Sequence, residues 1–359
     1  MTELQAVWGW QPALYLFLGG MGAGAFVTAA VLHFLDRGNT RRTVAASAWG
    51  ATILLMAGLL CLITELTNPL RGMMMWQSFT NFTSWMAFGA WIVFAAVVVF
   101  GLAAVCATDA TAALVQKVWK GFGAVRGRLL SALCVLGLFC GFCVAAYTGI
   151  LLMSAPGVPL WNTSLLPLLF TVSAFDTGIA FVEVVMAALA GREHASRRTH
   201  KAMNVCVVAL VVAELAVLGL FLGGMLAGGA AGGAEALTGS LSAHMLVFGD
   251  LALWFWGGVV LVGLVLPLAM AIVGLARETK RGNAAMNPVE DEAAAGEVQV
   301  ARGGQPARCD GNGLAVTGAI GAMIGGCVLR FLVVMAGVHG DLVAQGVDQI
   351  FEQMIARLS

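Results

Sequence analysis

The hydrophobic positions of this protein fall into eight long, nearly uncharged runs that are separated by short polar segments. An α-helix needs about 20 predominantly apolar residues to cross the hydrocarbon core of a bilayer. The pattern therefore predicts eight transmembrane helices, near Pro12–Leu35, Val44–Leu66, Thr83–Ala107, Arg128–Met153, Thr163–Ala190, Met203–Leu226, His244–Ala276 and Leu314–Val338.

Composition agrees with this pattern. Hydrophobic residues make up 60% of the 359 positions and charged residues only 11%, whereas soluble domains are about 25% charged. Lipid offers no partners to backbone N–H and C=O groups, so these runs are expected to be helical throughout. We predict an all-α integral membrane protein. Because the formal net charge is zero, nucleic acid is not an expected partner.

The Lys and Arg residues are distributed unevenly between the loops. Sixteen of the 19 lie in the loops after the first, third, fifth and seventh predicted helices. Basic residues accumulate in cytoplasmic loops, so these four loops are predicted to be cytoplasmic and both termini to be outside. The N-terminus lacks the basic region of a signal peptide, so the first run should be retained as a span.

This arrangement divides the sequence into three parts. Residues 1–276 hold the first seven predicted helices, and residues 314–359 hold the eighth helix and an outer C-terminal tail. Residues 277–313 are rich in Ala, Gly, Glu and Gln and contain Pro288 and Pro306. We interpret this segment as a flexible cytoplasmic linker.

The cysteines and histidines do not suggest a resident metal, haem or cluster. Cys140-Gly-Phe-Cys143 has metal-site spacing, but it lies inside a predicted span without a second pair, which favours packing. A membrane haem usually needs two histidines at matching depth. Here the histidines lie near the inner ends of predicted spans or in an inner loop (His33, His194, His200) or at outer ends (His244, His339). No nucleotide-binding or protease motif occurs in a plausible context.

Ionisable residues at membrane depth are the candidate chemistry. A charge at the bilayer centre costs at least about 2.5–3.5 kcal/mol, so such residues are expected to have a structural or functional role. Asp176 and Glu183 are seven residues apart and share one helix face. Two interpretations stay open. Arg330 could hold the bundle together by pairing with Asp250 or Glu214, or the set could carry protons: Asp176, Glu183, Glu214, Asp250 and Arg330.

A second set of polar residues gathers at the predicted outer end. Tyr147 ends the fourth run, and the backbone then turns through Pro156 and Pro159 before Trp161 and Asn162. Glu65, Asn68 and Arg71 follow the second run at the same end. A phenol can donate or accept a hydrogen bond, so these residues suit a polar pocket beside hydrocarbon.

A resemblance to a known family rests on several stretches, taken in their order along the sequence: Trp10-Gln-Pro12, Tyr15-Leu-Phe-Leu-Gly19-Gly20, Asn68-Pro69-Leu-Arg71, Ser84-Trp85, Tyr147-Thr148-Gly149, Pro159-Leu-Trp161-Asn162, Phe255-Trp256-Gly257 and Leu329-Arg330-Phe331. The set resembles the polysulfide-reductase-type, NrfD-like membrane subunits of multisubunit oxidoreductases. The sequence departs from that family at Glu65-Leu-Thr-Asn68-Pro69, where members often have an Asp-Leu-Gly-Arg-Pro sequence. It departs again at Asp176, where many have a neutral residue.

The resemblance implies two four-helix bundles in a prokaryotic cell membrane, without haem or iron–sulfur cluster in this protein. It implies a menaquinone site near the outer face and a ferredoxin-like [4Fe–4S] subunit docked there. That subunit would connect to a molybdopterin or multihaem cytochrome subunit, which acts on the terminal substrate.

On this hypothesis Tyr147 hydrogen-bonds a quinone oxygen, and Glu65 or His244 takes a proton. Asn68 and Arg71 orient the head group, and Trp161 and Asn162 complete the pocket. The alternatives are a proton-coupled secondary transporter, although no clear inverted repeat is visible, or a purely structural anchor.

Overall fold

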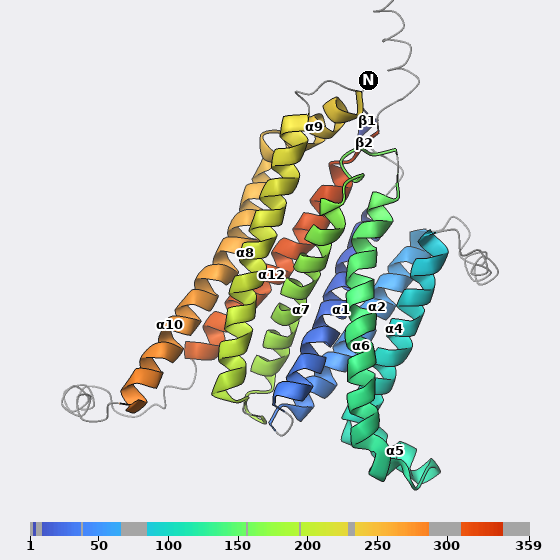
Figure 1. Ribbon diagram of the computed structural model, residues 1–359, viewed down its shortest axis with the longest axis vertical. Coiled ribbons are helices and arrows are strands. Elements are labelled where there is room, and N and C mark those ends of the chain that lie inside the picture. Colours follow the sequence, from blue (N-terminus) through green and yellow to red (C-terminus); the bar gives the residue numbers. More distant parts are fainter. Residues whose placement is uncertain are drawn as a thin grey trace, which may run out of the picture.

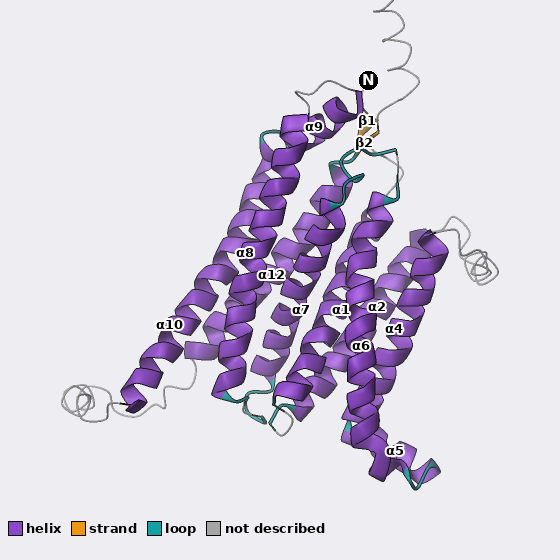
Figure 2. Ribbon diagram, viewed as in Figure 1, coloured by secondary structure: helices purple, strands orange, loops and turns teal. Residues whose placement is uncertain are grey.

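The computed structural model describes residues 3–4, 9–36, 39–65, 85–155, 157–193, 195–228, 234–286 and 310–339. These residues are almost entirely helical (Figure 1, Figure 2). The long helices are α1 (Trp10–Leu35), α2 (Arg41–Glu65), α4 (Trp85–Ala107), α6 (Phe122–Met153), α7 (Leu165–Ala188), α8 (Arg197–Gly228), α10 (Leu266–Met286) and α12 (Asp310–Met335). The shorter elements are α5 (Asp109–Val118), α9 (Ala234–Val247), the π-helical η3 (Trp254–Val265), β1 (Glu3–Leu4) and β2 (Val338–His339).

Eight helical segments are long and apolar enough to cross a membrane, as predicted. The seventh is η3 continued by α10, and it spans Trp254–Arg277. Pro267 stands where the two meet, and proline has no N–H to donate to the preceding turn. The prediction of an all-α integral membrane protein is confirmed.

The spans form two four-helix bundles. In the first bundle, α1 contacts α2 and α6, and α4 contacts the same two helices. In the second, α7 contacts α8 and α12, and α10 contacts the same two. The bundles meet through α1, which packs on α7 and α12, and through α6, which also packs on α7.

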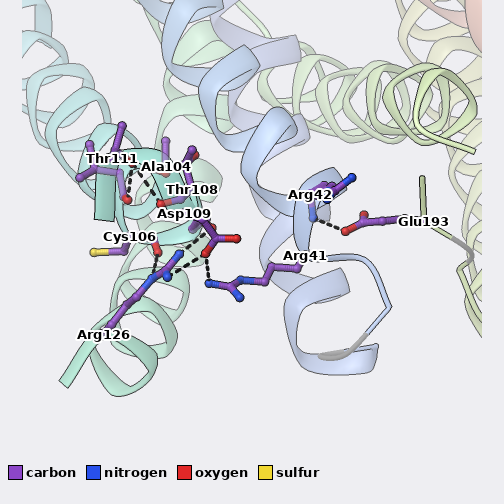
Figure 3. Close-up of polar contacts among 11 residues, drawn as sticks. Arg41, Arg42, Ala104, Cys106, Thr108, Asp109, Thr111, Arg126 and Glu193 are labelled. Carbon is purple, nitrogen blue, oxygen red and sulfur yellow. Dashed lines mark hydrogen bonds and ion pairs between the residues drawn. The ribbon is translucent and has the colours of Figure 1, made fainter. Parts of the chain in front are cut away.

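The two ends of this assembly differ in character. Arg41, Arg42 and Arg126 lie at one end, where α1 is followed by α2 and α4 by α5 (Figure 1, Figure 3). At the opposite end β1 pairs antiparallel with β2, so that Glu3 lies opposite His339 (Figure 1). The positive-inside rule predicts that the basic end is the cytoplasmic one and that the β1–β2 pair lies at the outer end; the two ends are named accordingly below.

Two predicted boundaries were wrong, and one loop contains a helix that was not predicted. The seventh predicted helix does not begin at His244, because α9 ends at Val247 and Gly249 and Asp250 form a turn before η3. Residues 277–286, assigned to the linker, continue α10. Between the third and fourth spans the loop contains the additional helix α5. The remainder of the predicted linker and most of the C-terminal tail lie outside the described residues.

The contact between the bundles depends on two glycines. A Cβ atom on Gly24 of α1 would overlap the backbone of Ala174 in α7, and one on Gly178 would overlap the backbone of Gly24. The two helices therefore touch backbone to backbone. Small residues permit this approach in membranes, where helices associate through close packing.

We predict that Gly178→Leu lowers the thermal stability of the purified protein in detergent. Inserting methylenes into a packed interface costs about 1–3 kcal/mol or more. The matched control is Gly219→Leu in α8, because a Cβ there meets nothing within 4 Å. Equal melting temperatures for the two variants would contradict this role of Gly178.

Candidate functional site: two phenols at the outer end and buried charges in the second bundle

Tyr147 lies in the core of the first bundle, near its outer end. It is six residues before the end of α6 and is 5% exposed. Tyr15, five residues after the start of α1, is 4% exposed. At a rise of 1.5 Å per residue, both phenols lie about 8–9 Å inside their helix ends.

Close contacts between α1 and α6 hold the two phenols in the outer part of the first bundle. Gly19 of α1 faces the Thr148 methyl of α6, one residue from Tyr147. The phenols are near enough to interact electrostatically. The sequence has only two tyrosines, and the fold brings both of them together.

Glycines of the other two helices make room for these rings. A Cβ on Gly89 of α4 would overlap the ring and hydroxyl of Tyr147, and one on Gly58 of α2 would lie 3.3 Å from Cδ2 of Tyr15. All four helices of the first bundle therefore contribute residues that pack around the two phenols. No described residue forms a hydrogen bond with either phenol hydroxyl.

The other predicted outer residues divide into three groups. Trp161 is buried and its indole Nε1 donates to the Val333 carbonyl (2.8 Å), which fixes the α6–α7 connection to α12. Asn162 is exposed next to it. Glu65 ends α2, but its side chain lies outside the described part of the structure, as do Asn68 and Arg71.

His244 is placed away from Tyr147. It is exposed on α9, which packs on α8 of the second bundle, and its ring lies 5.2 Å from that of Phe248. The structure instead brings Tyr15 near Tyr147, and the sequence analysis did not single out Tyr15. The scarcity of tyrosine and its similar distance from a helix end were the available signals.

Arg330 is the central charge of the second bundle. It is fully buried and donates to Ser173 Oγ (3.1 Å), the Gly326 carbonyl (2.9 Å) and the Phe170 carbonyl (3.4 Å). Its guanidinium carbon lies 5.3 Å from the Phe170 ring centroid and 5.9 Å from that of Phe17. Carbonyl dipoles and aromatic faces thus surround this cation.

Among the described residues, no carboxylate forms an ion pair with Arg330. The predicted partner Asp250 is exposed in the turn before η3, outside the span. Glu214 and Asp176 are 3% and 2% exposed and line the same narrow internal space as Ser173. Glu183 is half-buried further along α7. Three of the five predicted path residues thus gather around one space: Asp176, Glu214 and Arg330, the last through Ser173.

At the cytoplasmic end the bundles cap one another. The Asp36 carboxylate, just after α1, accepts from the Ser196 N–H (2.8 Å), the Thr199 hydroxyl (3.0 Å) and the Asn39 amide (3.0 Å). Burial alone would raise the pKa of Asp36, but these hydrogen bonds outweigh it and hold the pKa below its usual value. A carboxylate here caps the start of α8.

The reciprocal cap comes from Glu193, between α7 and α8. Its carboxylate accepts from the N–H groups of Arg42 and Thr43 at the start of α2 (Figure 3). Nearby, Arg126 binds the Cys106 and Ala107 carbonyls at the end of α4. A hydrogen bond from Arg126, with the adjacent Arg41, lowers the pKa of Asp109 (Figure 3).

Comparison with known proteins identifies the family to which this protein belongs. The model of the family described as "Polysulphide reductase, NrfD" matches residues 2–286. The protein belongs to the NrfD family. It is 30% identical over 285 residues to the C subunit of polysulfide reductase from Wolinella succinogenes, covering 74% of this sequence and 83% of the relative.

A second NrfD relative is protein NrfD of Escherichia coli K12. It is 31% identical over 283 residues, covering 74% of this sequence and 84% of the relative. NrfD proteins are membrane subunits of oxidoreductase complexes, and the present one is a multi-pass membrane protein of that kind.

We predict that Asp36→Asn destabilises the protein at neutral pH by about 1–3 kcal/mol, because buried donors lose a charged acceptor. The folded pKa is depressed, so this stabilisation is present above the unfolded pKa of about 3.9 and is lost as pH falls through the folded value. Melting curves from pH 7 to pH 3 should therefore converge for wild type and variant. Asp109→Asn, at an exposed site, should cost less. Melting curves of wild type and Asp36→Asn that stay parallel from pH 7 to pH 3 would contradict the capping role of the Asp36 carboxylate.

Proposed function

We propose that this NrfD-family protein is the membrane anchor and quinol-binding subunit of an oxidoreductase complex. It would exchange electrons between the menaquinone pool and an iron–sulfur partner. The observation that carries the proposal is the pair of buried phenols, Tyr15 and Tyr147, whose hydroxyls have no hydrogen-bond partner among the described residues. A phenol hydroxyl can donate or accept a hydrogen bond, so such a pair is suited to a polar ligand beside apolar helix faces.

The two phenols suit a quinone head group for a chemical reason. A phenol hydroxyl accepts from a quinol O–H and donates to a quinone oxygen, so it serves both oxidation states. Gly58 and Gly89 leave the surrounding wall apolar and close to the rings. Oxidation of one quinol releases two electrons and two protons at this end of the bundle.

The partner would receive the electrons at the outer face. The phenols lie close to that face, and a ferredoxin-like [4Fe–4S] subunit docked there would be the acceptor. A molybdopterin or multihaem cytochrome subunit would then act on the terminal substrate. The Wolinella succinogenes relative supports this arrangement, because its name makes it one subunit of a polysulfide reductase.

The test is quinol-dependent electron transfer in the assembled complex. We expect Tyr147→Phe and Tyr15→Phe each to lower the rate with a menaquinol analogue by at least about tenfold, since a positioned proton-transfer group contributes about 10²–10⁴-fold. Ser154→Ala is the control, because that hydroxyl binds only the Leu151 carbonyl at the exposed end of α6. Unchanged rates in both tyrosine variants would overturn the site.

Purification separates this function from the alternatives. An iron–sulfur subunit that co-purifies with the protein supports the redox complex. A stable lone protein that moves a solute in proteoliposomes would instead support a secondary transporter.

A second proposal concerns proton movement in the second bundle. Asp176 and Glu214 line one narrow space, and Asp176 Oδ1 has no hydrogen-bond partner among the described residues. Two facing carboxylates without an ion-paired cation favour a state that holds a proton between them. Glu183 continues the same face of α7 two turns inward.

We expect Asp176→Asn to reduce the number of protons translocated per electron pair in proteoliposomes, while the electron-transfer rate changes less than about twofold. Asp250→Asn is the matched control, because Asp250 is exposed at the outer turn. An unchanged proton-to-electron ratio in the Asp176 variant would contradict a role of Asp176 in proton transfer.

A further inference from the structure

The first bundle contains a cavity that the proposed function does not use. It lies at the cytoplasmic end and has a volume of about 330 Å³. Its wall includes His33 of α1, Thr40 and Arg41 at the start of α2, and Arg126 and Leu130 of α6. We call this cavity the cytoplasmic vestibule.

The polar groups of the vestibule make it a hydrated space. Water occupies about 30 Å³ per molecule in the liquid, so the volume has room for about ten molecules. His33 Nε2 lies 3.2 Å from Ser131 Oγ at the inner part of the wall. The charged groups that face the vestibule are Asp36, Arg41 and Arg126.

Above His33 the helix α1 becomes apolar. Between Tyr15 and His33, α1 has a single polar side chain, Thr28, whose hydroxyl donates to the Gly24 carbonyl of its own helix. Tyr15 and His33 are 18 residues apart, or about 27 Å along the helix. No hydrogen-bonding side chain of α1 therefore links the two levels.

Two stacked aromatic rings close this apolar stretch. Phe26 of α1 and Phe100 of α4 face one another with centroids 3.8 Å apart and ring planes 4° from parallel. Their exposed fractions are 1% and 0%. Gly137 of α6 packs so closely on Phe26 that a Cβ there would overlap the ring. Three of the four helices thus meet at this pair.

We propose that the Phe26–Phe100 pair is a proton barrier that separates the cytoplasmic vestibule from the outer half of the first bundle. A dry hydrophobic constriction excludes the water chain that proton transfer needs. Protons released beside Tyr15 and Tyr147 then leave on the outer side only. This last consequence rests on the proposed function, whereas the barrier itself does not.

The barrier is tested without quinol, in proteoliposomes of the full-length protein with a trapped pH-sensitive dye. We expect wild type to pass protons no faster than protein-free vesicles under an imposed potential. Phe26→Ala with Phe100→Ala should raise the proton flux at least tenfold. Phe221→Ala is the matched control, because it removes an equally buried ring from the second bundle. No increase in the double variant, or an equal increase in the control, would overturn the proposal.

A second measurement leaves the ring pair intact. Val44 lines the vestibule, whereas Ala96 lies one turn of α4 to the outer side of Phe100 and is fully buried. We expect Val44→Cys to react with a small charged thiol reagent from the cytoplasmic side at least tenfold faster than Ala96→Cys. The unmutated protein corrects for its native cysteines. Equal rates would show continuous water and refute the barrier, whether or not quinol binds.

Discussion

The backbone contact between α1 and α7 at Gly24 and Gly178 is the constraint on which the arrangement depends. It brings the two bundles close enough for α1 to serve both. On one side α1 presents Tyr15 to α2 and α6, and on the other it presents Phe17 and Gly20 to Arg330. A Cβ on Gly20 would lie 2.9 Å from the guanidinium, so that position also needs its small residue. Close packing without side chains thus decides where the polar groups lie.

Arg330 shows how a charge is held inside this assembly. Removing a guanidinium from water costs several kcal/mol even after relaxation. The cost is offset by Ser173, two carbonyls and two aromatic faces. No described carboxylate forms an ion pair with Arg330, although Asp176 and Glu214 line the same narrow space as its hydrogen-bond partner Ser173.

The bundles also differ in how their two ends are fixed. At the cytoplasmic end, Asp36 caps α8 and Glu193 caps α2, so each bundle satisfies the helix termini of the other. At the outer end the Tyr15 and Tyr147 hydroxyls have no partner among the described residues. The stacked Phe26 and Phe100 rings lie between these two ends of the first bundle.

The sequence by itself determined the eight spans and the family, and it predicted the orientation. Hydrophobic length and the positions of Lys and Arg depend on the bilayer and hardly on tertiary contacts. It also singled out Tyr147, Asp176, Glu214 and Arg330, because polar residues inside long apolar runs are easily recognised in a sequence. Only the tertiary structure paired Tyr15 with Tyr147, moved His244 and Asp250 out of the span, and replaced an expected ion pair of Arg330 by carbonyls and rings. These outcomes depend on which helix faces meet. Periodicity cannot specify those faces when nearly every position is apolar.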